Sequence, residues 1–222
     1  VRQALNFEVN KTALTETLLA YLVAPSGQPA GRFTSGHNPA VAPYPHDPAR
    51  ARALLKAAGY SDGFVLNIEV VANSLPADSL IYQSMAQDLR AVGIDVRMRA
   101  IPFPTFLRKY LSNDWGAVDA FGLSFTATPF NDALRPMENF SCINPKPFFC
   151  DKDIAAALRA AKGEFKPEAR QQMMNELAQR YHDAAPALFL VEQLDLYGYA
   201  PRLSGMRLAN RTPQYEALTF TP

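Results

Sequence analysis

The stretch DPARARALLKAAGYSDGFVLNIE at residues 47–69 decides the fold, because it holds the start and end of one helix and the strand that follows it. The Asp47 carboxylate can cap a helix, Pro48 suits the first helical position, where no N–H partner is needed, and Gly59 supplies a left-handed stop. Residues 64–70 then carry apolar side chains at every second position. The stretch predicts a helix of about three turns followed by a strand.

A second unit of the same kind comes next in the chain. Pro76 opens a helical pattern that Gly93 ends, and residues 94–100 alternate as a second strand. A right-handed crossover between parallel strands is the strong expectation for such a unit. A short helix at residues 104–111 and a largely buried strand at 118–125 complete this part of the predicted sheet.

Helical patterns also occur near both ends of the chain. Residues 1–22 read as helical, with Asn10 as an N-cap inside them. Two further helices are expected at residues 153–162 and 167–185, and the apolar ALFLVEQ at 187–193 reads as a strand.

The segment between the first two helical patterns is a long loop. Prolines and glycines recur throughout residues 23–46, and neither helix nor a central strand tolerates that composition. So long a segment without secondary structure is uncommon inside a compact domain and is often functional.

The opening VRQALNFEVNKTAL at residues 1–14 and the stretch at 47–69 together resemble the extracellular solute-binding protein family 5, which delivers peptides, nickel and related solutes to ABC importers. In that family the two segments typically read like VRQALNYAIDRxAI and YDPxKAKxLLxEAGYPDGF. Each phrase alone is weak, but the two in this order and at this separation are specific.

The resemblance implies an α/β fold, namely a lobe of the periplasmic-binding-protein type II class, with a mainly parallel sheet and helices on both faces. It places residues 1–193 in the C-terminal ligand-binding lobe and residues 194–222 in a tail that returns to a first lobe absent from this sequence. It also implies an upstream signal peptide and a periplasmic or extracellular location, with a lipoprotein anchor in a Gram-positive cell.

The function implied is that of the substrate-binding component of an ABC importer. Such a protein captures a peptide-like or other small solute between two lobes and delivers it to a permease in the inner membrane. It needs no cofactor and performs no covalent chemistry. A ligand-sensing or chaperone-like module on the same lobe is an alternative, and a serine hydrolase domain is a more remote one.

Composition agrees with a globular domain that does not bind nucleic acid. The chain has 222 residues, and its 22 Lys and Arg against 21 Asp and Glu give a net charge of +1. That charge creates no field to recruit nucleic acid or an anionic membrane. The sequence contains no apolar run near the roughly 20 residues that a membrane span requires.

The two cysteines, Cys142 and Cys150, enclose the short, turn-rich INPKPFF. An even count and local spacing favour a disulfide in an oxidising compartment, while two free thiols remain possible. Metal binding is disfavoured, because the sequence has neither a CxxC pair nor a histidine beside these cysteines.

Residues with catalytic potential do not form a recognisable pattern. His37 and His46 lie in the Pro-rich loop without an acidic ligand pair, and His182 is expected on a helix, so no metal site is predicted. Ser124 follows Gly122 as in a nucleophile elbow, but the second glycine of that motif is missing and no helical sequence follows. A hydrolase is therefore disfavoured.

The ligand loop is where the chain departs from the family it resembles. Ligands of open α/β sheets lie at the carboxyl ends of the strands, which selects the loop after residues 118–125. The family usually reads like WxxDYxDP there, and its acidic residue holds a peptide's α-amino group. Aligned on Gly122 and Leu134, Thr126 takes the place of that acid and Leu123 that of the tryptophan.

This departure bears on the solute. A buried ammonium needs a counter-charge, whereas a Thr hydroxyl offers a neutral hydrogen bond of about 1 kcal/mol. Asp132 or the other lobe could supply the missing carboxylate, and Arg135 suggests an anionic or carboxylated solute, although a surface arginine explains it equally well. The expected ligand-binding residues are Ser124, Phe125, Thr126, Thr128, Asn131 and Arg135.

Overall fold

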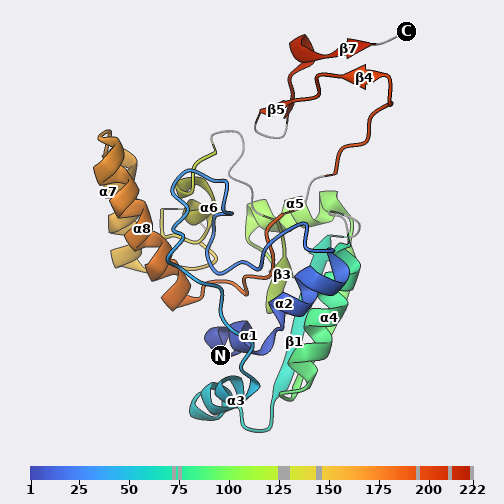
Figure 1. The fold of residues 1–222 in the computed structure, drawn as a ribbon. Helices are drawn as coiled ribbons and strands as arrows, with labels where there is room; N and C mark the ends of the chain where they lie inside the picture. The colour runs from blue at the N-terminus through green and yellow to red at the C-terminus, as the bar shows by residue number, and fades with distance from the viewer. Residues whose placement is uncertain are drawn as a thin grey trace.

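The protein is described here from a computed structural model, which covers residues 1–71, 74, 77–124, 131–143, 147–193, 196–209 and 212–220. Its central feature is a parallel sheet with the strand order β2-β1-β3 (Figure 1). Strand β1 (Phe64–Val71) pairs along its whole length with β2 (Ile94–Ile101), and residues 68–70 of β1 pair with β3 (Ala120–Gly122). The sequence-based prediction of parallel strands joined by a helical crossover is confirmed.

Helices cover both faces of this sheet. On one face, Leu66, Ile68 and Val70 of β1 pack in the main core with α4 and with the N-terminal helices. On the other face, Phe106 of α5 packs against Val71 at the carboxyl end of β1. The helices concerned are α1 (Arg2–Glu8), α2 (Lys11–Ala13), α3 (Pro48–Ala57), α4 (Asp78–Arg90) and α5 (Phe103–Ser112).

A second core forms beside the sheet from helices alone. Its members are α6 (Leu134–Asn139), α7 (Lys152–Gly163) and α8 (Pro167–Ala184), which pack around buried Tyr181 together with Ala30 and Val41 of the Pro-rich loop. In Figure 1, α7 and α8 lie side by side, away from the sheet, with α6 between them and the sheet. The loop at residues 23–46 thus contributes to the fold by filling this core.

The signals that end and begin helices act as the sequence predicts. Asp47 accepts a hydrogen bond from the Arg50 amide at 2.9 Å, and Asn10 accepts one from the Ala13 amide at 3.0 Å. Gly59 and Gly93 have φ angles of 83° and 86°, which only glycine adopts without strain. Pro76, predicted to open α4, lies outside the described residues.

The N-terminal helical pattern is broken where the sequence predicted one continuous stretch. Val9 has an extended backbone, and Asn10 then caps a new start, so that α1 is followed by α2 and by a π-helical turn at Leu14–Leu18. Positive φ angles at Ala20 and Tyr21 end the helical run before residue 22.

The predicted strand at residues 187–193 is wrong. The segment forms only an isolated bridge between Pro25 and Val191. Around this bridge the Ser26 N–H donates to the Leu190 carbonyl and the Glu192 N–H donates to the Ala24 carbonyl, each at 3.0 Å. The side chain of Asn6 also receives the Phe189 N–H at 3.1 Å and donates to the Ala187 carbonyl at 2.8 Å. The segment therefore takes its backbone partners from the Pro-rich loop and from a buried side chain of α1.

Lys11 is almost fully buried beside Asn6 and hydrogen-bonds to the Asn6 carbonyl at 2.8 Å. Burial lowers the pKa of the Lys11 ammonium to about 7 from its ordinary 10.5. Between these values the unfolded chain binds more protons than the folded one, so the free energy of unfolding rises with pH. The rise from this group is at most about 1.4 kcal/mol per pH unit.

We expect Lys11→Met to flatten the dependence of the free energy of unfolding on pH between pH 7 and 9. Urea denaturation at several pH values would measure this slope, with Lys56→Met, a change of an exposed lysine on α3, as the control. If Lys11→Met and the parent chain show the same slope, the buried ammonium does not titrate in this range.

Candidate functional site

The carboxyl ends of the parallel strands form the candidate site, because ligands of open α/β sheets bind there. Gly122, the last residue of β3, is packed against α4: a side chain at Gly122 would lie 2.5 Å from the Tyr82 hydroxyl oxygen. Burial, with a smaller contribution from the charge of Asp78, raises the pKa of Tyr82 to about 12. Tyr82 is thus a neutral hydroxyl at physiological pH, held across the end of β3.

The first predicted ligand residue, Ser124, lies two residues beyond this strand end. Its hydroxyl donates to Gln193 Oε1 at 2.9 Å and so ties the end of β3 to the end of the 187–193 segment. The hydrolase alternative needs a histidine acting on Ser124. The Nδ1 atoms of His37 and His182 instead lie 3.1 and 2.9 Å from the carbonyl oxygens of Ala30 and Gly27.

The predicted residues Phe125, Thr126 and Thr128 lie outside the described residues. Beyond them, Asn131 has a φ of 50°, and its carbonyl accepts the Ser35 amide at 3.1 Å. Ser35 also forms a parallel bridge with Asp132. The Pro-rich loop therefore holds the far end of the candidate ligand loop through backbone hydrogen bonds.

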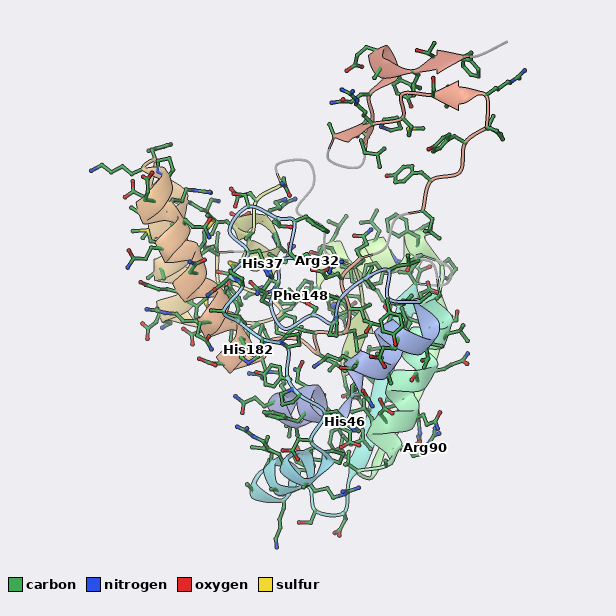
Figure 2. All side chains as sticks on the ribbon, viewed as in Figure 1. Arg32, His37, His46, Arg90, Phe148 and His182 are labelled. Atoms are coloured by element: carbon green, nitrogen blue, oxygen red, sulfur yellow. A yellow bond between two sulfur atoms is a disulfide. The ribbon has the colours of Figure 1, made fainter. Side chains whose placement is uncertain are left out.

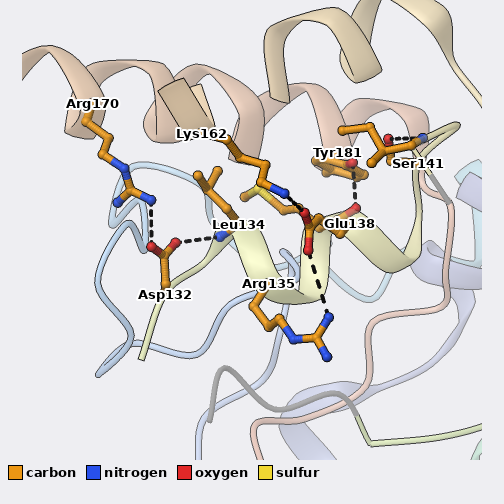
Figure 3. Close-up of polar contacts among 10 residues, drawn as sticks. Asp132, Leu134, Arg135, Glu138, Ser141, Lys162, Arg170 and Tyr181 are labelled. Carbon is orange, nitrogen blue, oxygen red and sulfur yellow. Dashed lines mark hydrogen bonds and ion pairs between the residues drawn. The ribbon is translucent and has the colours of Figure 1, made fainter. Parts of the chain in front are cut away.

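Asp132 has structural partners inside the lobe, which weighs against the hypothesis that it replaces the family's acidic residue. One carboxylate oxygen accepts the amide of Leu134, the first residue of α6, at 2.9 Å, and the other accepts Arg170 Nη2 at 2.6 Å (Figure 3). Both oxygens already have strong donors inside the lobe. A solute ammonium would have to displace a half-buried ion pair to reach this carboxylate.

Arg135, the remaining predicted residue, lies on α6 with a half-exposed side chain. Its Nη1 is 3.8 Å from Glu138 Oε2, and Lys162 binds the other oxygen of Glu138 (Figure 3). An exposed pair at this distance is worth roughly 0.2–1 kcal/mol. Arg135 can therefore turn to another anion at little cost, and its predicted contact with solute stays a prediction.

An aromatic cluster that sequence reasoning did not predict as a unit lies beside the end of β3. Trp115 stacks on Phe121 with ring centroids 4.3 Å apart, and Phe106 and Tyr110 of α5 pack around them. Phe148 completes the cluster at 4.9 Å from Phe121. Trp115 and Phe121 serve as core side chains, because both pack on buried Phe106.

A buried carboxylate lies next to this cluster, where Lys109 contacts both Trp115 and Glu69. Glu69 of β1 is buried under α5, where it ion-pairs with Arg99 of β2 and with Lys109 at 2.8 Å. Burial opposes ionisation of Glu69, but hydrogen bonds from Lys109 and Arg99 outweigh it and lower the pKa of the carboxyl group. The ion pairs fix α5 to the sheet.

The predicted disulfide between Cys142 and Cys150 is confirmed. It closes the loop that carries Phe148 onto Tyr110, whose ring centroid is 5.1 Å away. The disulfide thus holds one aromatic side chain of the cluster in place.

We expect the double change Cys142→Ser and Cys150→Ser to lower the free energy of unfolding by about 2.5 kcal/mol, the value expected from chain entropy for a loop of this length. Thermal unfolding with and without a reductant measures it. Reductant should lower the parent's midpoint and leave that of the variant unchanged. Equal midpoints for the parent and the variant without reductant would contradict the prediction.

Metal-binding clusters and membrane-spanning helices are both absent from the described part of the chain. Within it, no cluster of three or more His, Cys, Asp or Glu side chains is arranged to hold a metal ion. The described helices also include none that is long and apolar enough to cross a membrane.

Comparison with known proteins decides the family. The model of bacterial extracellular solute-binding proteins, family 5 Middle, matches residues 1–145. The chain belongs to this family. Its members are solute-binding proteins that act outside the cytoplasm, which agrees with the resemblance seen in the two opening phrases.

Curated relatives match over much of this family 5 chain. A di/tripeptide-binding protein 2 from Pseudomonas aeruginosa is 23% identical over 216 residues, which cover 94% of this chain and 40% of the relative. A glutathione-binding protein GsiB from Pectobacterium atrosepticum is 36% identical over 101 residues, or 46% of this chain and 19% of the relative. This family 5 chain therefore spans less than half the length of these relatives.

Solved structures share the fold. HbpA2 from Haemophilus parasuis superposes with a TM-score of 0.82 at 17% identity, covering all of this chain and 45% of that one. The periplasmic binding protein DppA from Helicobacter pylori, in complex with the peptide STSA, gives a TM-score of 0.79 at 20% identity and covers 99% of this chain and 43% of that one. The α/β architecture of a periplasmic binding protein is confirmed.

Proposed function

We propose that this chain is the C-terminal lobe of the substrate-binding component of an ABC importer. The match of the family 5 model over residues 1–145 carries the proposal. The whole protein would capture a small solute between two lobes that close about a hinge and would then present the closed form to a membrane permease. Binding and closure are sufficient for this role, so we propose no covalent catalysis.

The end of the chain supports the division into a lobe at residues 1–193 and a tail at 194–222. None of the described tail residues is buried, and the tail strands pair only with one another, β4 (Leu203–Ser204) with β7 (Thr219–Phe220) and β5 (Leu208–Ala209) with β6 (Thr212–Pro213). Figure 1 shows the tail extending beyond the sheet. We propose that its exposed apolar side chains pack on the first lobe of the whole protein; these are Leu196, Tyr197, Tyr199, Leu208, Tyr215 and Phe220.

The solute would lie against the loop between Ser124 and Asn131, whose two ends are both held by the lobe. With Thr126 in the acidic residue's place and Asp132 already paired to Arg170, this wall offers no free carboxylate from either position to a peptide's ammonium. We therefore propose a solute that is neutral or carboxylated on this side, with Arg135 available as its counter-charge. A peptide-like solute fits if the first lobe supplies the acid.

A thermal-shift screen of the full-length protein tests this function, with peptides, carboxylated small molecules and metal chelates as candidates. A ligand at 100 times its Kd stabilises the folded state by about 2.7 kcal/mol. Stabilisation by one solute class supports transport. Absence of a shift with every class, together with labelling of Ser124 by a serine-directed probe, would instead support the hydrolase alternative.

We expect two changes in the candidate loop to weaken binding of that solute about five- to tenfold each, since each removes a hydrogen bond worth about 1 kcal/mol. They are Thr126→Val and Asn131→Gly, and glycine keeps the positive φ of position 131 accessible. Calorimetric titration measures the affinity. Thr17→Ala, a change in the N-terminal segment, is the control, and an equal loss in all three variants would contradict the placement of the site.

A further inference from the structure

A pocket of about 290 Å³ opens on a part of the lobe that the solute site does not use. Phe7 of α1, Pro43 and Tyr44 of the Pro-rich loop, Arg50 of α3 and His182 at the end of α8 line it. Figure 1 shows α1 and α3 beside the amino end of β1, away from the carboxyl ends of the strands. Figure 2 labels His182 in the pocket wall and His46, which follows the pocket residue Pro45.

The pocket has a rigid aromatic wall. The Tyr44 ring stacks on His182 with centroids 4.0 Å apart and meets the edge of Phe7 at 4.9 Å. The Tyr44 hydroxyl donates to the backbone carbonyl of His182, and His182 Nδ1 is 2.9 Å from the Gly27 carbonyl oxygen. His182 and Lys11 Nζ lie against the faces of Tyr44, and Arg50 lies over Phe7, so another ring can meet this wall only edge-on.

The cation in this pocket is the Arg50 guanidinium, which is available to bind an anionic ligand. The Arg50 guanidinium lies over the Phe7 ring at 4.1 Å, and within the described part of the chain it forms neither a hydrogen bond nor an ion pair with an acceptor. A guanidinium offers several N–H donors in a fork that matches a carboxylate. The charge of Asp183, the acidic residue at the pocket, is partly used, because its Oδ1 accepts the Gln179 amide at 2.9 Å.

From this geometry we propose that the pocket binds a small aromatic carboxylate. Its ring packs against Pro43 and the edges of Phe7 and Tyr44, and its carboxylate pairs with the Arg50 guanidinium. The volume lies at the lower end of the roughly 300–1,000 Å³ typical of ligand pockets, which favours a molecule with a single ring. This second site is independent of the proposed transport function.

Calorimetric titration of the full-length protein with phenylacetate tests the proposal. Arg50→Gln is expected to weaken binding at least tenfold, because the carboxylate loses its charged partner. Asp183→Asn is expected to tighten it, because it removes the like charge at the pocket. Arg159→Gln, a change of an exposed arginine on α7, is the control and leaves the affinity unchanged.

Phenethylamine, which has the same ring and the opposite charge, should bind more weakly than phenylacetate. The proposal is overturned if phenylacetate gives no binding heat, if Arg50→Gln binds it as the parent does, or if the amine is preferred. Should Arg50→Gln not fold, Asp183→Asn and Arg159→Gln still decide the matter, because only Asp183→Asn should tighten binding. Unchanged affinity in Asp183→Asn would place phenylacetate elsewhere and overturn the proposal.

Discussion

Replacing Gly63 by alanine is expected to lower the free energy of unfolding by about 2–5 kcal/mol. Gly63 precedes β1 with a φ of 75°, and a Cβ there would overlap the carbonyl group of Gly93, which precedes β2. The cost combines about 1–2 kcal/mol for a left-handed residue with about 1–3 kcal/mol for overpacking. The two glycines allow the starts of neighbouring parallel strands to approach closely.

Gly59→Ala is the matched control for this prediction. Gly59 has a φ of 83°, but its Cβ would meet no atom within 4 Å. The control therefore keeps the left-handed strain and lacks the clash, so a loss of about 1–2 kcal/mol is expected. Urea denaturation measures both variants. Equal losses would show that the contact between Gly63 and Gly93 does not limit the packing of the two strands.

Asn6→Leu is expected to cost about 2–6 kcal/mol of unfolding free energy. Asn6 is fully buried and serves both the Phe189 N–H and the Ala187 carbonyl, while Lys11 Nζ lies 3.4 Å from its Oδ1. Leucine keeps a similar volume but leaves two backbone groups buried without partners, each at about 1–3 kcal/mol.

The control for Asn6 is Gln172→Leu, a change of an exposed amide on α8 that should stay within about 0.5 kcal/mol of the parent. Hydrogen exchange at the Phe189 amide gives a local measurement, and that amide should exchange much faster in Asn6→Leu. A loss below about 1 kcal/mol with unchanged exchange at Phe189 would show that the 187–193 segment does not depend on this side chain.

Local signals in the sequence were sufficient to predict the parallel sheet and most of the helices. Capping residues and glycines determine the backbone conformation within a few positions of themselves. Asp47, Gly59 and Gly93 therefore predict helix ends correctly. The strand expected at residues 187–193 was wrong for a non-local reason. Its apolar composition is compatible with a strand, but the neighbour it meets is a Pro-rich loop, and a side chain 183 positions before Phe189 satisfies its backbone.

The candidate site likewise has features that the sequence predicts and features that depend on non-local contacts. Its position at the carboxyl ends of the strands follows from topology, which the sequence pattern predicts. Topology does not show which side chains pair with one another. The pairing of Asp132 with Arg170 and the burial of Glu69 beneath Lys109 depend on contacts between elements far apart in the chain. The solute contacts of Asn131 and Arg135 also stay predictions, because topology does not show which side chains meet a ligand.

Hydrogen exchange of the full-length protein, with and without the solute that stabilises it most in the thermal-shift screen, tests the central claim most directly. If this lobe forms one wall of a solute-binding cleft, solute should slow amide exchange at residues 122–135, at the carboxyl end of β3, and leave α1 and α3 unchanged. Unchanged exchange at residues 122–135, in a protein that the solute clearly stabilises, would contradict the account.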